Sequence, residues 1–410
     1  MDQHSPVYLV GGPVRDALLG RPVKDLDFSV EGDAPALAQR VAAELAGKTI
    51  VHPRFGTATV IAGGTRIDLV TARRETYTHP GALPQVTPSG IRDDLARRDF
   101  SINAMAIPLA GDAAEVLDHW RGLEDLRLGV VRTLHDCSFI DDPTRVFRAI
   151  RYEQRLDFRI DQQTLAHLKN SVDQGLVAVL SPDRLRHEIQ RILEEENPAP
   201  AFARCLDLEV LQAVHPALND LGKLQRLAAG IGDIGAEIEA EIPMVYLAAL
   251  VSDLSEQEGE DLIGRLNMPE GWRRIVRDSI RLQGMAAELN DESISPSRLV
   301  RLLEDVSVVA VAAMGLTSED AWVNQGLHRF LTELRHVKPG LDGRDLLQLG
   351  VPPGPLVGRI LGRLRDEVLD GRLDGGAGAD AGRRRLVQEL MADTIVGPVG
   401  AEAIGDAGHG

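Results

Sequence analysis

The segment formed by residues 9–16, Leu-Val-Gly-Gly-Pro-Val-Arg-Asp, constrains the fold more than any other part of the chain. Its apolar start and double glycine predict a short strand, a tight turn and then a short helix. Nine residues later, residues 25–28, Asp-Leu-Asp-Phe, predict a second strand. Side chains at positions i and i+2 of a strand point to the same face, so Asp25 and Asp27 project together. The chain is therefore expected to begin with a sheet that presents two carboxylates near a glycine turn.

These groups together have the chemistry of a phosphate and metal site. Two adjacent carboxylates repel each other unless a cation or a shared proton relieves them, and such oxygen ligands suit Mg²⁺ that also binds substrate phosphates. Gly11 and Gly12 leave backbone N–H groups accessible, and Arg15 adds a guanidinium for phosphate oxygens. The order and spacing favour a site for a metal-bound nucleoside triphosphate over a plain tight turn and an exposed strand. No G-x-G-x-x-G follows the first strand, so this is not a dinucleotide-binding fingerprint.

A third carboxylate, Asp68, lies in residues 66–70, Arg-Ile-Asp-Leu-Val, which also predict a strand. If that strand is a neighbour of the one that bears Asp25 and Asp27, Asp68 completes a three-carboxylate site. Such a site holds metal and helps to deprotonate an attacking hydroxyl. An ordinary exposed strand aspartate is the alternative, and the sequence leaves open whether Asp68 is a metal ligand or a base.

Secondary-structure patterns divide the chain into an α/β head and an all-helical remainder that begins near residue 135. Strands are predicted at residues 7–10, 25–30, 57–61 and 67–70, and a helix at residues 34–45 separates the second of these strands from the third. Residues 80–90, rich in proline and glycine, are expected to form a loop. Residues 374–382 and the last fifteen or so residues are expected to be flexible.

Composition excludes several classes of protein. The formal net charge of −17 argues against indiscriminate nucleic-acid binding, and we expect no DNA partner. Only two cysteines occur, and they are far apart, which fits a reducing cytoplasm. We see no signal peptide. The longest nearly apolar run, residues 306–316, is too short to span a bilayer, so we expect a buried helix there and no membrane association.

Residues 97–106, Arg-Arg-Asp-Phe-Ser-Ile-Asn-Ala-Met-Ala, carry the most specific motif. The paired arginines supply phosphate donors, and Asp99 and Asn103 supply groups that bond a ribose hydroxyl. As a string, the segment resembles motif B of the class II tRNA nucleotidyltransferase and poly(A) polymerase family, often written R-R-D-F-T-x-N-A-x-A. Ser101 replaces the usual threonine and keeps the hydroxyl.

Four further segments resemble motifs of the same family, in the family's order. The opening G-G-x-V-R-D with D-x-D is similar to motif A, with Pro13 where alanine is common. Residues 117–122 are similar to the motif that connects head and neck. Residues 141–151 resemble the nucleotide-selecting motif, commonly E-D-x-x-R, with Asp141 in place of glutamate, and residues 181–188 resemble the helix start that follows. The match covers roughly residues 7–195.

The nucleotide-selecting segment also has a physical interpretation. Five arginines recur at three- and four-residue steps, which predicts that they share one face of a helix, with Asp142 one turn before the first of them. They are Arg145, Arg148, Arg151, Arg155 and Arg159. A carboxylate accepts from the exocyclic amine of cytosine or adenine, and an arginine donates to the ring nitrogen beside it. Uracil and guanine present the opposite pattern and would meet unpaired or repelling groups. A solvated, salt-bridged helix, with Glu153 and Asp157, is the alternative.

The resemblance implies an α+β fold, in which a nucleotidyltransferase-type mixed-sheet head is followed by an all-α neck, body and tail. The implied head is residues 1–135, the neck residues 136–200, the body residues 201–300 and the tRNA-binding tail residues 301–394. Residues 395–410 are expected to form a flexible C-terminus.

The implied activity is template-independent addition of CMP and AMP to the 3′ end of tRNA, with CTP and ATP as substrates and pyrophosphate as product. Asp25, Asp27 and Asp68 are the implied catalytic residues, and Asp25 and Asp27 would hold Mg²⁺. The residues implied to bind the nucleotide are Gly11, Gly12, Arg15, Arg98, Asp99, Asn103, Asp142, Arg145, Arg148 and Arg151.

Three activities in this family are hard to separate from sequence: full CCA addition, addition restricted to CC or to the final A, and poly(A) synthesis. Full CCA addition is the default expectation. The segment after Thr71, residues 72–84, departs from the form associated with complete CCA enzymes, in which loop mobility is thought to govern the switch from C to A. Two alternatives from other classes are a non-catalytic RNA-binding protein and a small-molecule nucleotidyltransferase.

Overall fold

The computed structural model describes residues 5–23, 25–53, 56–110, 115–233, 241–373 and 380–395. The chain divides into two compact units, each with its own core. The first unit comprises Met1–Leu221 and Glu260–Met268, and the second comprises Gly222–Gly259 and Pro269–Gly410.

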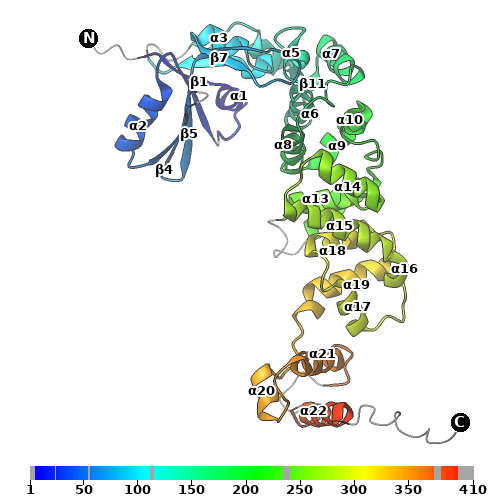
Figure 1. Cartoon of the computed structure of the whole chain (residues 1–410). Helices are drawn as coiled ribbons and strands as arrows, with labels where there is room; N and C mark the ends of the chain where they lie inside the picture. The colour runs from blue at the N-terminus through cyan, green and yellow to red at the C-terminus, as the bar shows by residue number, and fades with distance from the viewer. Residues whose placement is uncertain are drawn as a thin grey trace, which may run out of the picture. The chain divides into compact units, whose positions relative to one another are not determined.

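A seven-stranded mixed sheet forms the start of the first unit (Figure 1). Its order is β3-β4-β5-β2-β1-β8-β9, and only the β2 and β5 pair runs parallel among these neighbours. The strands are β1 (Val7–Val10), β2 (Leu26–Val30), β3 (Lys48–His52), β4 (Thr57–Ala62), β5 (Thr65–Thr71), β8 (Met105–Pro108) and β9 (Leu117–Asp118). The four predicted strands and the mixed-sheet head are confirmed. Strand β3 was missed, because it is a short edge strand with exposed polar residues at both ends.

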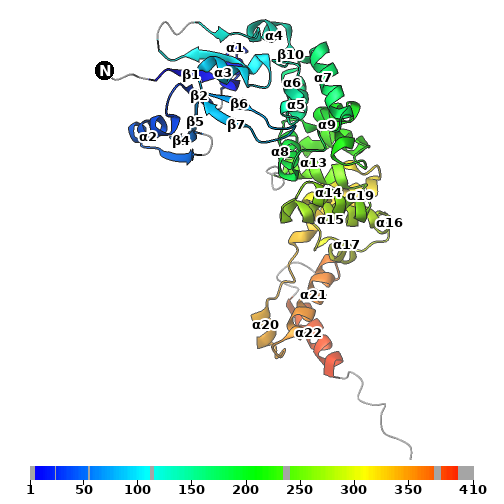
Figure 2. The ribbon, with the colours of Figure 1, turned by 45° about the horizontal axis from the view of Figure 1, so that its top comes forward.

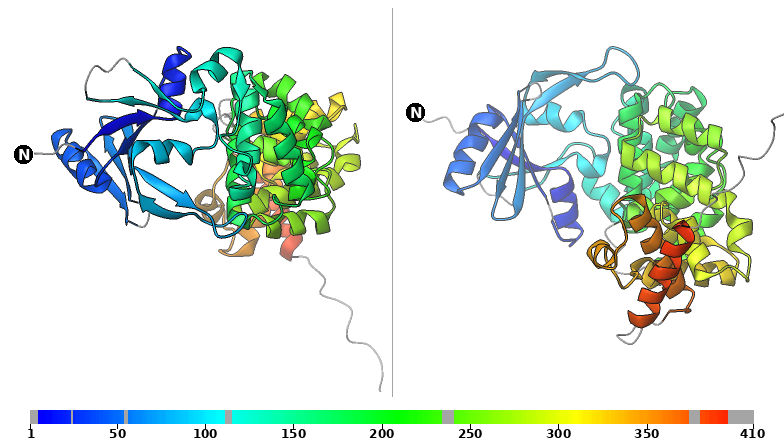
Figure 3. Two further views of the ribbon diagram at one scale, coloured as in Figure 1. Left: turned by 90° about the horizontal axis from the view of Figure 1, so that it is seen from above. Right: turned by 60° about the horizontal axis from the view of Figure 1, so that its bottom comes forward.

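Helix α2 (Ala34–Glu44) covers one face of this sheet (Figure 3). The Asp33 side chain caps it by accepting from the Ala36 N–H at 2.9 Å. Ala34, Ala38 and Ala42 recur every four residues and are buried against the sheet. The predicted helix at residues 34–45 is confirmed. Because its buried side chains are small and recur on one face, the helix can approach the sheet closely.

A two-stranded hairpin, β6 (Arg73–Thr76) and β7 (Gln85–Pro88), follows the sheet strand β5 (Figure 2). The predicted loop at residues 80–90 is therefore wrong for residues 85–88. These residues form a strand because β6 supplies hydrogen-bonding partners from nine or more residues away, which a local pattern does not reveal. Helix α3 (Ile91–Ala96), the 3₁₀ helix η2 (Ser101–Asn103) and helix α4 (Gly122–Leu128) complete the head.

The rest of the first unit is almost entirely helical. Its helices are α5 (Ser138–Asp141), α6 (Arg145–Leu156), α7 (Gln162–Asp173), α8 (Pro182–Leu193), α9 (Pro198–Asp207), α10 (Val210–Val214) and much of α14 (Glu256–Arg265). Helix α1 (Gly12–Leu18) belongs to the head. The short strands β10 (Val130–Val131) and β11 (Arg159–Ile160) pair in parallel.

The predicted arginine face is present for the four arginines within α6, and the prediction is wrong for Arg159 and for Asp142. Helix α6 stops at Leu156, where Asp157 adopts a left-handed conformation with φ 56°, so Arg159 lies in β11 instead. Asp142 does not share the face of Arg145 as a helical residue, because its backbone is extended between α5 and α6. Side-chain periodicity carries no signal for where a helix ends, and here a backbone reversal decides it.

Helices make up the second unit within its described residues. They are α11 (Gly222–Gly230), η3 (Ile231–Asp233), α13 (Ile242–Val251), α15 (Glu270–Gly284), α16 (Ala286–Leu289), α17 (Pro296–Leu303), α18 (Val308–Thr317), α19 (Ala321–Thr332), η4 (Leu334–His336), α20 (Gly343–Gln348), α21 (Pro355–Leu369) and α22 (Asp380–Ile395). The apolar run at residues 306–316 forms most of α18 and is largely buried, as predicted. Across the described ranges, no helix combines the length and the apolar character needed to cross a membrane.

The stretches predicted to be flexible lie mostly outside the described residues. Residues 374–379 and 396–410 lie outside the described residues, whereas residues 380–382 and Ile395 belong to α22. The proposed boundaries between neck, body and tail stay predictions.

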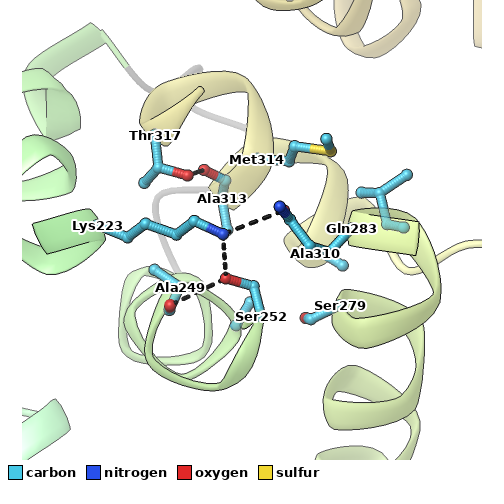
Figure 4. A pocket seen from close by; sticks show the side chains of 11 residues that line it. Lys223, Ala249, Ser252, Ser279, Gln283, Ala310, Ala313, Met314 and Thr317 are labelled. Carbon is cyan, nitrogen blue, oxygen red and sulfur yellow. Dashed lines mark hydrogen bonds between the residues drawn. The ribbon is translucent and has the colours of Figure 1, made fainter. Parts of the chain in front are cut away.

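A lysine ties three helices of the second unit together (Figure 4). Lys223 Nζ donates to Ser252 Oγ at 2.9 Å, to Asp253 Oδ1 at 2.7 Å and to Gln283 Oε1 at 3.0 Å. The adjoining cavity of about 10 Å³ also borders Met314 and Thr317 of α18. A cavity of that volume has room for about one water molecule, so it is too small for a substrate. The hydrogen bonds of Lys223 therefore serve to stabilise the helical unit.

Candidate active site

Three carboxylates gather where β2 and β5 run side by side. The parallel register places Asp27 directly opposite Asp68, and Asp25 lies one residue before β2 at an exposed position. Burial raises the pKa of Asp27, and the negative charges of Asp68 and Asp25 raise it further. A carboxylate that is costly to ionise beside two others favours a nearby cation. The predicted neighbourhood of Asp68 and the Asp25 and Asp27 pair is thus present in the fold.

The donor set fits a divalent cation that is shared with a substrate. Asp68 already accepts hydrogen bonds from Thr59 Oγ1 and from Arg66 Nε, the latter at 2.9 Å. Among the described residues, no three acidic, histidine or cysteine side chains meet in an arrangement that could hold an ion alone. Divalent ions such as Mg²⁺ commonly take one or two carboxylates and complete their coordination with phosphate oxygens and water. Asp25 and Asp27 match that pattern.

The glycine turn lies beside an arginine of the motif at residues 97–106. Gly11 has φ 74° and ψ −131°, a conformation that residues with a Cβ rarely adopt. A Cβ on Gly11 would lie 2.6 Å from Arg98 Nη1. Arg98 also feels the charge of Asp27, and its Nε is buried without a hydrogen-bond partner within the described part of the chain. Burial also lowers the pKa of Arg98. Because Nε has no hydrogen-bond partner among the described residues, a bound anion would satisfy this donor.

Arg15 holds the turn to the same motif. It is 5% exposed, and its Nη1 donates to Asn103 Oδ1 at 2.8 Å while its Nε donates to Asp16 Oδ1 at 2.8 Å. A Cβ on Gly12 would lie 3.6 Å from Arg15 Nη2. The structure therefore brings Gly11, Gly12, Arg15 and Asn103 together, and Arg15 is already engaged by protein groups.

A buried carboxylate, Asp99, is the centre of a polar network that joins the head to α6. It accepts from the Phe100 N–H at 2.9 Å, from Asn103 Nδ2 at 3.0 Å and from Arg148 Nε at 2.7 Å and Nη2 at 2.5 Å. Burial opposes ionisation of Asp99, but the Arg148 guanidinium and the other donors hold its pKa below the ordinary value. The pair of Asp99 and Arg148 fixes Asn103 and, through it, Arg15.

Tyr152 is a residue of this network that the sequence analysis did not single out. Its ring meets the Phe100 ring edge to face, with centroids 5.7 Å apart. The guanidinium carbons of Arg15, Arg148 and Arg155 lie 5.2, 5.6 and 5.9 Å from its centroid. Two predicted nucleotide-binding arginines therefore share one aromatic platform. The sequence contained a clue to this contact, because Arg148 and Tyr152 are four residues apart and therefore lie on the same face of a helix.

The predicted nucleotide-selecting residues Asp142 and Arg145 do not pair through their side chains. Arg145 is 5% exposed, and its guanidinium donates to Ser138 Oγ at 2.6 Å and to the Arg97 carbonyl at 2.8 Å. The Asp142 carboxylate instead accepts from Arg184 Nη2 at 2.6 Å. Arg184, in the first turn of α8, was missed because only the folded chain brings α8 to this carboxylate.

Arg151 contacts helix α8 and the residues that follow it. Its Nε donates to Glu195 at 2.8 Å, and Arg155 donates to the same carboxylate, also at 2.8 Å. Glu188 lies 3.9 Å from Arg151 Nη1. These contacts join α6 to α8, so Arg151 and Arg155 stabilise the helix that carries Arg148.

Two known domain families match the chain. The Poly A polymerase head domain matches residues 7–132, and the family described as "Probable RNA and SrmB- binding site of polymerase A" matches residues 157–221. The first match includes the carboxylate cluster, the glycine turn and the motif at residues 97–106. The second begins just after α6.

Curated relatives are about one third identical to this chain over the aligned residues. An A-adding tRNA nucleotidyltransferase of Geobacter sulfurreducens is 35% identical over 85% of this chain and 42% of its own length. One of Halalkalibacterium halodurans is 35% identical over 85% of this chain and 81% of its own length. A CC-adding tRNA nucleotidyltransferase of Deinococcus radiodurans is 32% identical over 86% and 81%. The chain thus spans less than half of the Geobacter protein.

Solved structures agree with these relatives. The apo form II of a CCA-adding enzyme has a TM-score of 0.79 and 31% identity, with 95% of this chain and 92% of that chain covered. The Thermotoga maritima CCA-adding enzyme complexed with tRNA has a TM-score of 0.74 and 30% identity, with the same coverage. The likeness extends through the head and the helical remainder, and it confirms the expected nucleotidyltransferase-type fold. The chain belongs to the class II tRNA nucleotidyltransferase and poly(A) polymerase family.

Proposed function

We propose that this chain adds AMP from ATP to the 3′ end of a tRNA that already ends in CC. The observation that carries nucleotidyl transfer is the in-register pair of Asp27 and Asp68 with Asp25 beside it, adjacent to Arg98 and the glycine turn. Such a cluster has the charge and the donors that a metal-bound triphosphate requires. A non-catalytic RNA-binding protein would have no use for this costly group of like charges.

The reaction places each group in a role. The oxygen of the tRNA 3′-hydroxyl bonds to the α-phosphorus of ATP, the bond from that phosphorus to the β-phosphate oxygen breaks, and pyrophosphate leaves. Asp68 accepts the hydroxyl proton. Asp25 and Asp27 would hold Mg²⁺, and the bound ion would supply positive charge to the reacting phosphate oxygens.

The nucleotide is held by the groups around the cluster. Arg98 and the backbone of Gly11 and Gly12 bind the triphosphate, and Asp99 and Asn103 orient the ribose. The predicted nucleotide-binding arginines Arg15, Arg145, Arg148 and Arg151 act on the nucleotide by holding these groups and α6 in place, because protein groups already occupy their donors. The helical remainder holds the tRNA by shape and backbone charge, as is usual for RNA helices.

Restriction to AMP is supported by the hairpin β6–β7. An enzyme that changes nucleotide between additions must let the segment beside its reading groups rearrange. Here Glu75 is 6% exposed and accepts from Arg73 at 2.8 Å, from Arg97 at 3.1 Å and from Tyr77 at 2.9 Å. Because the Glu75 carboxylate restrains the hairpin, the hairpin favours one arrangement of the site and therefore one nucleotide. The A-adding relatives from two organisms support the same choice.

Full CCA addition is the second candidate. Two of the solved structures that resemble this chain, each over 95% of its length, are those of CCA-adding enzymes. That activity needs the same cluster and differs only in which nucleotides the site accepts.

Single-nucleotide addition tests the proposal. Three tRNA transcripts, which lack CCA, end in C or end in CC, are each given Mg²⁺ with ATP, CTP, UTP or GTP. Incorporation of one AMP on the CC-ended transcript alone is the expected result, and stepwise C, C, A addition would support the second candidate. Long A-tails on unrelated RNA would indicate a poly(A) polymerase.

Two matched variants separate catalysis from binding. Asp27→Asn should abolish addition while tRNA binding in a filter assay persists. Asp136→Asn changes a carboxylate that is 77% exposed and should behave as wild type. If wild type binds tRNA but adds nothing to any transcript, the chain is an RNA-binding protein and the proposed function is wrong.

A further inference from the structure

Arg184 connects two segments that are far apart in the sequence. Its Nη2 donates to Asp142 Oδ1 at 2.6 Å, and its Nη1 donates to the Gly81 carbonyl, in the hairpin loop between β6 and β7, at 2.9 Å. The side chains of Arg184 and Asp142 are each 22% exposed. Both groups are thus ordered by contacts and still open to a ligand.

The contacts at Asp142 all act on one oxygen. Thr144 donates to Asp142 Oδ1 from its backbone N–H at 3.1 Å and from Oγ1 at 2.6 Å, and Arg184 donates to that same atom. Within the described residues, no protein donor reaches Oδ2. These contacts restrict χ2, which otherwise rotates over a broad range, and leave Oδ2 able to accept a hydrogen bond from a ligand.

Arg145 is not in a position to hold Asp142. Its two terminal nitrogens donate to Ser138 and to the Arg97 carbonyl in the interior, and it is nearly buried. The guanidinium that accompanies Asp142 at the surface of the site is that of Arg184.

We propose that Arg184 is a positioning residue for nucleotide choice, which fixes Asp142 so that Oδ2 accepts from the exocyclic amine of the incoming base. This inference rests on the proposed function. An amine at that place is a donor and satisfies Oδ2, whereas the carbonyl of guanine is an acceptor and repels it. The second contact, to Gly81, makes the same arginine hold the hairpin loop against the reading carboxylate.

The test compares purines that differ at the atom that Asp142 reads. ATP carries an amine there, GTP a carbonyl, and purine-riboside triphosphate only hydrogen. The ratio of kcat/KM for ATP to that for each of the other two is measured on the CC-ended tRNA. For Arg184→Ala we expect both ratios to fall about tenfold or more, since a hydrogen bond to a charged group is worth roughly that factor. Arg184→Lys, which keeps the charge without the fork, should fall between Arg184→Ala and wild type.

Arg186→Ala is the matched control. Arg186 lies on the same helix, pairs with Asp183 at 2.7 Å and donates to the Leu266 and Asn267 carbonyls, away from Asp142. Its loss should leave both ratios unchanged. Thr144→Val removes another donor to Asp142 Oδ1 with little change of shape, and it should lower the ratios even if Arg184→Ala does not fold.

Several outcomes would overturn the inference. One is a folded Arg184→Ala whose rates with all three nucleotides fall by the same factor, which would make the arginine merely structural. Another is an equal loss of preference in Arg186→Ala. Failure of the proposed function looks different: wild type would then add no AMP to the CC-ended tRNA. If wild type takes CTP instead, the same variants are tested with CTP against UTP, which differ by the same exchange of amine for carbonyl.

Discussion

Replacing Asp99 with alanine tests whether the network between the head and α6 stabilises the first unit. Asp99 is 7% exposed and accepts two hydrogen bonds from Arg148 and one each from Asn103 and the Phe100 N–H. Removing it leaves a guanidinium that is 31% exposed without its carboxylate. Breaking one partner of a buried ion pair costs about 3–5 kcal/mol. Because water reaches part of Arg148, we expect the lower end, about 3 kcal/mol.

Urea unfolding, with hydrogen exchange of the α6 amides as the local readout, measures this loss. The matched control is Glu124→Ala, which breaks an ion pair with Arg121 whose side chains are 51% and 71% exposed. Its cost should be about 0.5 kcal/mol. Asp99→Ala with Arg148→Ala should cost less than the sum of the two single changes, because the unpaired charge is gone. Equal losses for Asp99→Ala and Glu124→Ala, or full additivity of the double variant, would refute the reasoning.

Two other predictions concern the cluster itself. Gly11→Ala should lower the free energy of unfolding by about 3 kcal/mol, because the backbone is strained and the Arg98 guanidinium must move. Gly20→Ala, also at positive φ but with open space around it, should lower it by about 1 kcal/mol. Equal losses in urea unfolding would contradict this prediction. Asp27→Asn should raise the melting temperature of metal-free protein at pH 7. Its raised pKa means that ionised Asp27 opposes folding above that pKa and ceases to do so below the unfolded value. The gain should therefore shrink between pH 7 and pH 4 by differential scanning fluorimetry in EDTA, and a destabilised variant at pH 7 would count against a costly carboxylate.

Local signals account for the features of the fold that were predicted correctly. The strand, glycine turn and helix at residues 9–18 follow from apolar residues and from Gly11, whose φ of 74° only glycine adopts freely. The helix at residues 34–44 follows from the spacing of its apolar residues, and the helix at residues 308–317 follows from a continuous apolar run. Each of these signals acts within about one turn of chain, so it survives without knowledge of the rest.

Features that depend on distant partners were predicted incompletely. Strand β7 forms because β6 pairs with it. Arg159 does not lie on the helix with the other arginines because α6 ends before Asp157, which has a left-handed conformation. The resemblance implied that Asp142 and Arg145 read the base, and that assignment stays a prediction. The contact between Asp142 and Arg184, which lies 42 residues away in α8, was missed because only the folded chain forms it.

The sequence by itself determined which chemical groups this protein has: the carboxylates at residues 25 and 27, the glycine turn, the motif at residues 97–106 and the order of a mixed-sheet head before helices. Only the tertiary structure decided which of them meet. Asp68 joins the cluster because the parallel register of β2 and β5 sets it opposite Asp27, and a slip of one residue would turn it to the other face. Tyr152 reaches the candidate site through its contacts with Phe100 and Arg15, and Arg184 reaches it through its hydrogen bonds to Asp142 and Gly81. Residue type and spacing are local properties, whereas register and helix packing minimise the free energy of the whole unit.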